Sequence, residues 1–88
     1  MKLVRKVRIK NALGLHARPA TMIVKLLLNC KSEVTFTHKR AVINAKSILS
    51  ILMLAATKNT QLTVTVDGDD ADDIMDKLVT VFENGFGE

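Results

Sequence analysis

The chain has 88 residues, of which 48% are hydrophobic, and it contains three Phe but no Trp or Tyr. This length suits one small domain with an aliphatic core and is too short for a closed cavity around a sizeable substrate. Its single cysteine, Cys30, excludes an internal disulfide, and Cys30, His16 and His38 lack zinc-site spacing, so we expect no metal and no cofactor.

The charged residues are distributed unevenly. Residues 1–58 contain twelve of the thirteen Lys and Arg but one acid, whereas residues 59–88 contain eight acids and one base. A basic segment of this kind could attract nucleic acid, an anionic metabolite or an acidic protein surface, and charge alone does not choose among them. The apolar runs 23–28 and 51–56 are far too short to span a membrane, and the first ten residues do not form a signal peptide. We therefore expect a cytoplasmic protein without membrane insertion.

The first half of the chain predicts a strand, a helix and a hairpin. Lys6–Lys10 alternates with period two, as in a half-buried strand with basic residues facing outward. Apolar residues recur at helical spacing from about Ala17 to Asn29, with Pro19 in the first turn, where its missing N–H is not needed. Two further strands are expected at Glu33–Thr37 and Ala41–Ile43.

The second half predicts a short helix, a strand and a final helix. Ser47 is placed to cap a helix that runs to Leu54, and Leu62–Val66 alternates as a strand. Asp70–Asp73 resembles an acid-based capping box for the last helix, which Gly85 would stop. The order βαββαβα predicts an α+β open-faced β-sandwich, in which three helices cover one face of a four-stranded antiparallel sheet.

His16 is expected at or beside the start of the first helix. A helix start offers unpaired N–H groups and the positive end of the helix dipole, which attract anions. Arg18 adds a planar, permanently charged group that suits phosphate oxygens. An imidazole is partly unprotonated near neutral pH and can act as a nucleophile, so this arrangement predicts reversible phosphoryl capture. The alternative is an ordinary surface histidine at a helix cap.

Two motifs carry a family resemblance. Gly14–Ala20 reads GLHARPA, and Lys46-Ser47-Ile48 lies thirty-one residues beyond His16. Together with the element order and the closing segment 84–88, these motifs resemble HPr, the histidine-containing phosphocarrier family of the sugar phosphotransferase system. The resemblance covers nearly the whole chain and implies a single HPr-like domain over residues 1–88. It implies a monomeric phosphocarrier, with no independent turnover of its own.

The resemblance also implies partners and roles. Phosphorylated enzyme I would phosphorylate His16 on Nδ1, and His16 would pass the group to IIA domains of sugar permeases. The side chain of Arg18, with the backbone N–H groups of Ala17 and Arg18, would steady the phosphoryl oxygens. We do not expect nucleic acid among the partners.

A second modification site and a docking surface follow from the same resemblance. Lys46-Ser47-Ile48 resembles the site that HPr kinase/phosphorylase modifies, although Ser47 could equally be a helix cap alone. Phosphate there would add nearly two negative charges to the partner-facing surface. The first and second helices form the docking surface in the family, which implies contacts from Thr21, Lys25, Lys46, Ile48, Leu49 and Leu52.

Four residues depart from the pattern common in the family. Lys39-Arg40 stands where Asn-Gly is frequent, so a wider or strained hairpin is expected. Ala55 stands where glycine is common after the second helix, and Leu28 stands where some members carry lysine. The turn residues leave open a different partner selectivity, and Ala55 leaves open a different end for the second helix.

Two alternative functions remain at this point. One is a nitrogen-branch or purely regulatory member of the same family. The other, more distant, is a small basic nucleic-acid-binding module, although the strands lack aromatic stacking residues and the chain has no GxxG loop.

Overall fold

The computed structural model describes all 88 residues and has the predicted order of elements. No helix combines the length and apolar character needed to cross a membrane. The elements are β1 (Lys2–Arg8), α1 (Ala17–Leu26), β2 (Glu33–His38), β3 (Ala41–Asn44), α2 (Ile48–Leu54), β4 (Gln61–Asp67), α3 (Ala71–Glu83) and a short 3-10 helix, η1 (Gly85–Gly87).

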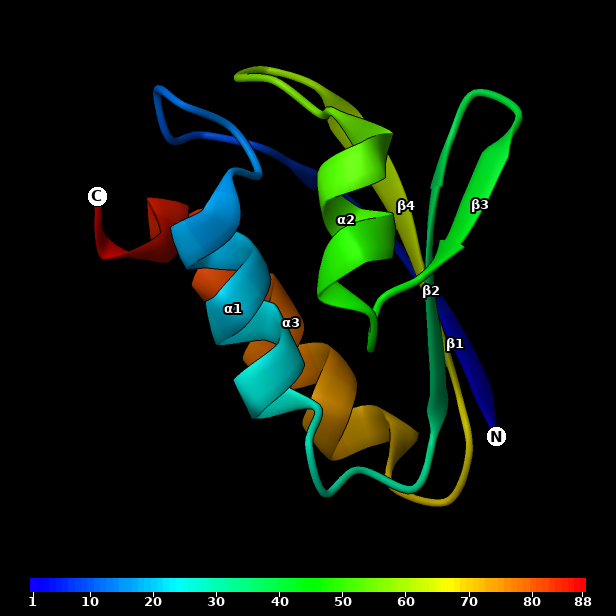
Figure 1. Cartoon of the computed structure of the whole chain (residues 1–88). Helices are drawn as coiled ribbons and strands as arrows, with labels where there is room; N and C mark the ends of the chain where they lie inside the picture. The colour runs from blue at the N-terminus through cyan, green and yellow to red at the C-terminus, as the bar shows by residue number, and fades with distance from the viewer.

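The four strands form one antiparallel sheet in the order β1-β4-β2-β3. The helices α1, α2 and α3 lie on one side of this sheet and leave its other face open (Figure 1). The predicted open-faced α+β sandwich is therefore confirmed.

Alternation along β2 and β4 separates a buried face from an open one. Val34 pairs with Val66 and Phe36 with Val64, and all four are almost completely buried beneath the helices. The residues between them are threonines, which are only partly buried on the other face. Burial of the apolar face against the helices is the main force that holds the layers together.

The strand expected at Lys6–Lys10 is wrong in its bounds, because β1 begins at Lys2 and ends at Arg8. Ile9 leaves the ladder, and its N–H donates to the carbonyl of Thr60 at 2.9 Å. The residue remains fully buried, so its period-two position signals burial rather than strand pairing.

The first helix is shorter than predicted. It ends at Leu26, with Leu27 as the C-cap, although apolar residues continue at helical spacing beyond that point. The N–H of Leu28 donates to Lys25 and that of Cys30 to Leu27, so the segment after α1 tightens into turns.

The β2–β3 hairpin is not wider than usual. His38 pairs directly with Ala41, which leaves Lys39 and Arg40 as a two-residue connection. Lys39 takes a φ of 56°, in the left-handed region that favours glycine, so the expectation of strain is confirmed. Ala55 likewise ends α2 with a φ of 51°, where a glycine would fit more easily.

The capping box predicted at Asp70–Asp73 is wrong. Asp70 occupies the N-cap position of α3, but its side chain makes no capping hydrogen bond. Its carboxylate instead accepts hydrogen bonds from the Ser32 hydroxyl and, at 2.8 Å, from the backbone N–H of Lys31. Asp70 therefore ties the start of α3 to the segment that follows α1.

Candidate functional site

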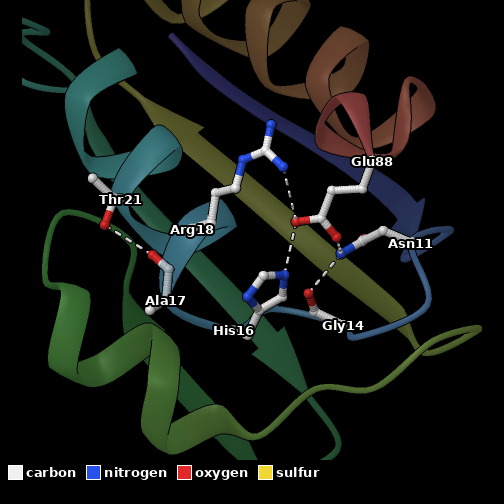
Figure 2. A network of polar contacts seen from close by, with 7 residues as sticks. All are labelled: Asn11, Gly14, His16, Ala17, Arg18, Thr21 and Glu88. Atoms are coloured by element: carbon white, nitrogen blue, oxygen red, sulfur yellow. Dashed lines mark hydrogen bonds and ion pairs between the residues drawn. The ribbon is translucent and has the colours of Figure 1, made fainter.

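His16 is the N-cap residue of α1, as predicted. Its backbone is extended, with φ −79° and ψ −169°, and its carbonyl accepts from the N–H of Ala20 at 3.1 Å. The N–H groups of Ala17 and Arg18 in the first helical turn therefore have no partner within the helix, and Pro19 lacks an N–H. The structure brings the imidazole, the Arg18 side chain and this amide-rich helix end together (Figure 2).

The loop before α1 is fixed against the segment after α2. Leu15 is buried, and its N–H donates to the carbonyl of Ala56 at 3.0 Å. Gly14 takes a φ of 65°, and a Cβ there would lie 2.3 Å from the same carbonyl oxygen. Only glycine therefore satisfies both the close approach and the left-handed backbone that places His16.

Glu88 is a residue of this site that sequence reasoning missed. Its Oε2 lies 2.7 Å from Nε2 of His16 and 3.9 Å from Nη1 of Arg18 (Figure 2). The Glu88 side chain is only 17% exposed, compared with 33% for His16 and 63% for Arg18. The closing segment resembles that of the family, but no local pattern shows that its carboxylate reaches His16.

Asn11 links the loop to this carboxylate and was likewise missed. It is 4% exposed, and its Nδ2 donates to the carbonyl of Gly14 at 2.7 Å and to Oε1 of Glu88 at 3.1 Å. Its buried Oδ1 has no hydrogen-bond partner. The sequence indicated only a turn here.

The pKa of Glu88 is lowered by its surroundings. Burial raises it, but hydrogen bonds from Asn11 and His16 and the positive charges of His16 and Arg18 outweigh that effect. Glu88 is therefore ionised at neutral pH and acts only as a hydrogen-bond acceptor. The helix end that attracts anions already has an internal carboxylate beside it.

Ser47 caps α2, as predicted. Its Oγ accepts a hydrogen bond from the N–H of Ser50 at 3.2 Å, and the residue is partly exposed. The side chain thus has a structural role whether or not it is modified.

The helices α1 and α2 pack beside each other and expose apolar side chains. Of the apolar residues in α2, only Ile51 is fully buried. Leu49 is 68% exposed, and Ile48 and Leu52 are more than one third exposed. Met53 and Leu28 are 75% and 73% exposed but were not among the predicted contacts. For Met53, the sequence of α2 did contain a signal, because a helix with apolar residues on nearly all sides must expose some of them.

The polar residues among the expected docking contacts, Thr21, Lys25 and Lys46, differ in their surroundings. Lys25 and Lys46 are exposed, and Nζ of Lys46 lies 3.5 Å from the carbonyl oxygen of Cys30. The Thr21 hydroxyl donates to the carbonyl of Ala17 at 2.8 Å, so it bonds within α1.

His16 does not lie in a hollow. Two surface hollows of about 280 and 250 Å³ occur elsewhere, one beside β2 and β3 and the other between the end of α1 and the start of α3. No cluster of three or more His, Cys, Asp and Glu has a geometry that could hold a metal ion. The site itself presents a partly exposed imidazole, an exposed guanidinium and the first amides of α1.

Comparison with known proteins shows which family the chain resembles in sequence and in structure. Residues 3–84 match the family described as the PTS HPr component phosphorylation site. Phosphocarrier protein HPr of Chlamydia muridarum is 48% identical over 80 residues, which cover 91% of this chain and 77% of that protein. Phosphocarrier protein NPr of Proteus mirabilis is 35% identical over 89 residues, covering 100% and 99%.

The crystal structure of HPr-C-His from Thermoanaerobacter tengcongensis superposes with a TM-score of 0.93 at 32% identity, over 98% of this chain and 97% of that one. Fold, motif and relatives define a phosphocarrier, which carries a phosphoryl group without independent turnover. The chain belongs to the HPr family of the phosphotransferase system.

Proposed function

We propose that His16 is the phosphoryl acceptor of this carrier and that it reacts through Nδ1. The observation that carries the proposal is the position of a partly exposed imidazole at the amide-rich start of α1, with its Nε2 bonded to Glu88. In the reaction, the Nδ1 lone pair forms the new bond to phosphorus while the bond to the donor breaks, and the donor keeps that electron pair. The Nε2 proton stays in place, and transfer to the next acceptor reverses these changes.

Arg18 and the first helix amides stabilise the transferred group in this proposal. The N–H groups of Ala17 and Arg18 supply donors without intrahelical partners, and the guanidinium supplies a positive charge. Arg18 is 63% exposed and its Nη1 lies 3.9 Å from Glu88, too far for a hydrogen bond, so the side chain can turn toward phosphoryl oxygens at little cost.

Phosphorylated enzyme I is the proposed donor, and IIA domains of sugar permeases are the proposed acceptors. The exposed apolar side chains of α2 offer a docking surface beside the site, centred on Leu49 and Leu52 and edged by Ile48, Thr21, Lys25 and Lys46. Family membership supports a single carrier domain that acts as a cytoplasmic monomer.

Ser47 is proposed as a regulatory site for HPr kinase/phosphorylase. Ser47 is partly exposed and directly precedes the exposed residues Ile48 and Leu49 in the chain. A phosphate there would add charge to the docking surface and disfavour an acidic or apolar partner.

The match to a protein named NPr favours a second candidate, in which the same histidine chemistry serves a nitrogen-branch or regulatory set of acceptors. Phosphorylated carrier incubated with acceptor domains of both branches distinguishes the two by which domain gains the label. For the nucleic-acid alternative, all three Phe are at most 1% exposed, so the sheet offers no aromatic platform for bases.

The test of His16 uses the other histidine as its control. Wild type, His16→Ala and His38→Ala are incubated with phosphoenolpyruvate and enzyme I, and intact masses are measured at neutral pH. We expect one phosphoryl group on wild type and on His38→Ala, and none on His16→Ala. Labelling of His16→Ala to the wild-type level would overturn the assignment, provided that its amide spectrum shows a native fold.

The test of Ser47 is separate. Incubation with ATP and HPr kinase/phosphorylase is expected to add one phosphate to wild type and to Ser50→Ala, and none to Ser47→Ala. If Ser47→Ala is modified as readily as wild type, Ser47 is a helix cap only.

A further inference from the structure

The side-chain amide of Asn11 can adopt only one orientation. Its Nδ2 contacts two acceptors, the Gly14 carbonyl at 2.7 Å and Oε1 of Glu88 at 3.1 Å. If the amide were flipped, Oδ1 would face both of these oxygens and no hydrogen would lie between them. Both hydrogens of the amide group are therefore committed.

This orientation leaves Oδ1 of Asn11 buried without a partner. An unpaired buried acceptor costs folding free energy, and an apolar side chain of the same size would avoid that cost. The residue is therefore poorly explained as a packing element. The two hydrogen bonds made by its amide group are the feature that accounts for it.

The bond from Asn11 also determines how Glu88 faces His16. With Oε1 occupied by the buried amide, Oε2 is the oxygen that meets Nε2 of His16 at 2.7 Å (Figure 2). An ionised carboxylate can only accept hydrogen bonds, so the nitrogen that faces it must carry the proton. In the neutral imidazole, Nδ1 is then the nitrogen with the free lone pair.

We propose that Asn11 is a positioning residue for phosphoryl transfer: by holding Oε1 of Glu88, it directs Oε2 to His16 and fixes the imidazole proton on Nε2. This inference rests on the proposed function, because only phosphorylation at Nδ1 gives the tautomer a role in the chemistry. Asn11 does not touch the reacting atoms and acts entirely through Glu88.

Glu88→Gln gives a test with opposite expectations for the two nitrogens. The amide group of Asn11 requires an oxygen opposite it, so the introduced glutamine should turn its NH₂ group toward His16. Nε2 must then accept, and the proton moves to Nδ1. Arg18 favours the other orientation, but its Nη1 lies 3.9 Å away on an exposed side chain, whereas Asn11 is 4% exposed and within hydrogen-bond distance.

The double variant Asn11→Leu/Glu88→Gln isolates the part played by Asn11. Leucine has a similar size but no donor, so the introduced glutamine is released and can turn its oxygen toward Nε2 of His16. We expect Glu88→Gln to raise the Nδ1–H population of the neutral imidazole roughly fivefold, the scale of one hydrogen bond, and the double variant to reverse most of that rise.

The measurement is a nitrogen-15 NMR spectrum of the imidazole, recorded well above its titration range. Glu83→Gln, on an exposed glutamate at the end of α3, and Asn29→Leu, on an exposed asparagine, are the matched controls. Both should leave the tautomer ratio as in wild type. Asn11→Ala/Glu88→Gln, which adds no bulk, is measured in parallel in case the introduced leucine disturbs the loop, and amide spectra report the fold.

Two results would overturn the proposal. One is a tautomer ratio in Glu88→Gln equal to that of wild type. The other is a tautomer ratio that is the same in Glu88→Gln and in the double variant Asn11→Leu/Glu88→Gln. The spectrum needs no phosphoryl donor, so it remains informative even if His16→Ala shows that another residue is the acceptor. With enzyme I and phosphoenolpyruvate, the phosphorylation rate should fall in Glu88→Gln and recover in the double variant.

Discussion

Two carboxylates, at opposite ends of α1, are held in similar ways for different purposes. Beyond the end of the helix, Asp70 accepts hydrogen bonds from the Ser32 hydroxyl and the Lys31 amide, and these lower its pKa. At the start, the pKa of Glu88 is also lowered, although burial opposes the shift, by Asn11 and by the cationic groups of His16 and Arg18.

The difference lies in the donors. Those of Asp70 are neutral and keep their protons at any physiological pH, so the contact can act as a permanent tie between α1 and α3. Glu88 instead accepts hydrogen bonds from the buried amide of Asn11 and from the partly exposed imidazole of His16. It also lies 3.9 Å from the exposed guanidinium of Arg18. The exposed parts of this contact, from His16 and Arg18, can therefore be exchanged when another anion arrives.

The largest effect on stability is expected from Gly68→Ala, in the connection between β4 and α3 that also contains Asp70. A Cβ at Gly68 would lie 2.5 Å from Oγ and 2.6 Å from Cα of Ser32, both well inside normal contact. Part of this clash is with backbone, so the β4–α3 connection must shift. We expect the free energy of unfolding to fall by about 1–3 kcal/mol, the usual range for overpacking, as measured by chemical denaturation.

Asp69→Ala is the control for Gly68→Ala, because this exposed neighbour has no hydrogen bond from its side chain to the protein. It should change the free energy of unfolding by no more than about 0.5 kcal/mol. If Gly68→Ala changes the free energy of unfolding as little as Asp69→Ala does, the close packing of Gly68 against Ser32 does not contribute to stability.

A smaller, pH-dependent effect is expected from Asp70→Asn. A lowered pKa in the folded state stabilises the fold above the ordinary pKa of the group, 3.8, and this stabilisation is lost as the pH falls through the lowered value. An asparagine can accept from only one of the two donors and does not titrate. Asp70→Asn should therefore lower the thermal midpoint at pH 7, and the gap from wild type should narrow in acid.

Thermal unfolding monitored by circular dichroism from pH 7 down to pH 2 measures this gap, with Asp69→Asn as the control. Glu88 also has a lowered pKa, so some acid dependence should persist in Asp70→Asn. A gap that stays constant over this range would mean that the ionised carboxylate of Asp70 adds nothing to stability.

The features that could be predicted from the sequence depend on residues that are close together in the chain. Alternation identified β2 and β4 because one face of each strand is buried, and the GLHARPA motif placed His16 at a helix start. The end of α1 was misplaced because no Gly or Pro follows it, while apolar residues continue beyond Leu26. Both the correct predictions and the misplaced helix end therefore follow from neighbouring residues in the sequence.

The missed features depend on contacts between distant residues. Asp70 has the sequence signature of a helix cap, but its carboxylate bonds to Ser32, thirty-eight residues earlier in the chain. Glu88 and His16 are seventy-two residues apart and meet because η1 turns the chain back after α3. Neither partner could be chosen from spacing, because any nearby hydroxyl or imidazole would have matched the pattern equally well.

The smallest of the predicted effects is on anion binding at the start of α1, in the variant Glu88→Ala. Loss of the carboxylate removes a negative charge beside Arg18 and leaves the positive charge there uncompensated. Inorganic phosphate should then shift the amide signals of Ala17 and Arg18 at a concentration roughly two- to fivefold lower than in wild type, the scale of one charge near a helix terminus.

Titrations at constant ionic strength, with chloride replacing phosphate in a parallel series, separate binding from screening of charge. Asp70→Asn is the matched comparison, because it neutralises a carboxylate at the other end of α1 and should leave the phosphate response unchanged. Equal responses in Glu88→Ala and wild type would show that the carboxylate does not compete with an incoming anion. Equal gains in Glu88→Ala and Asp70→Asn would instead assign the effect to net charge, and the distinction between an exchangeable and a permanent tie would be lost.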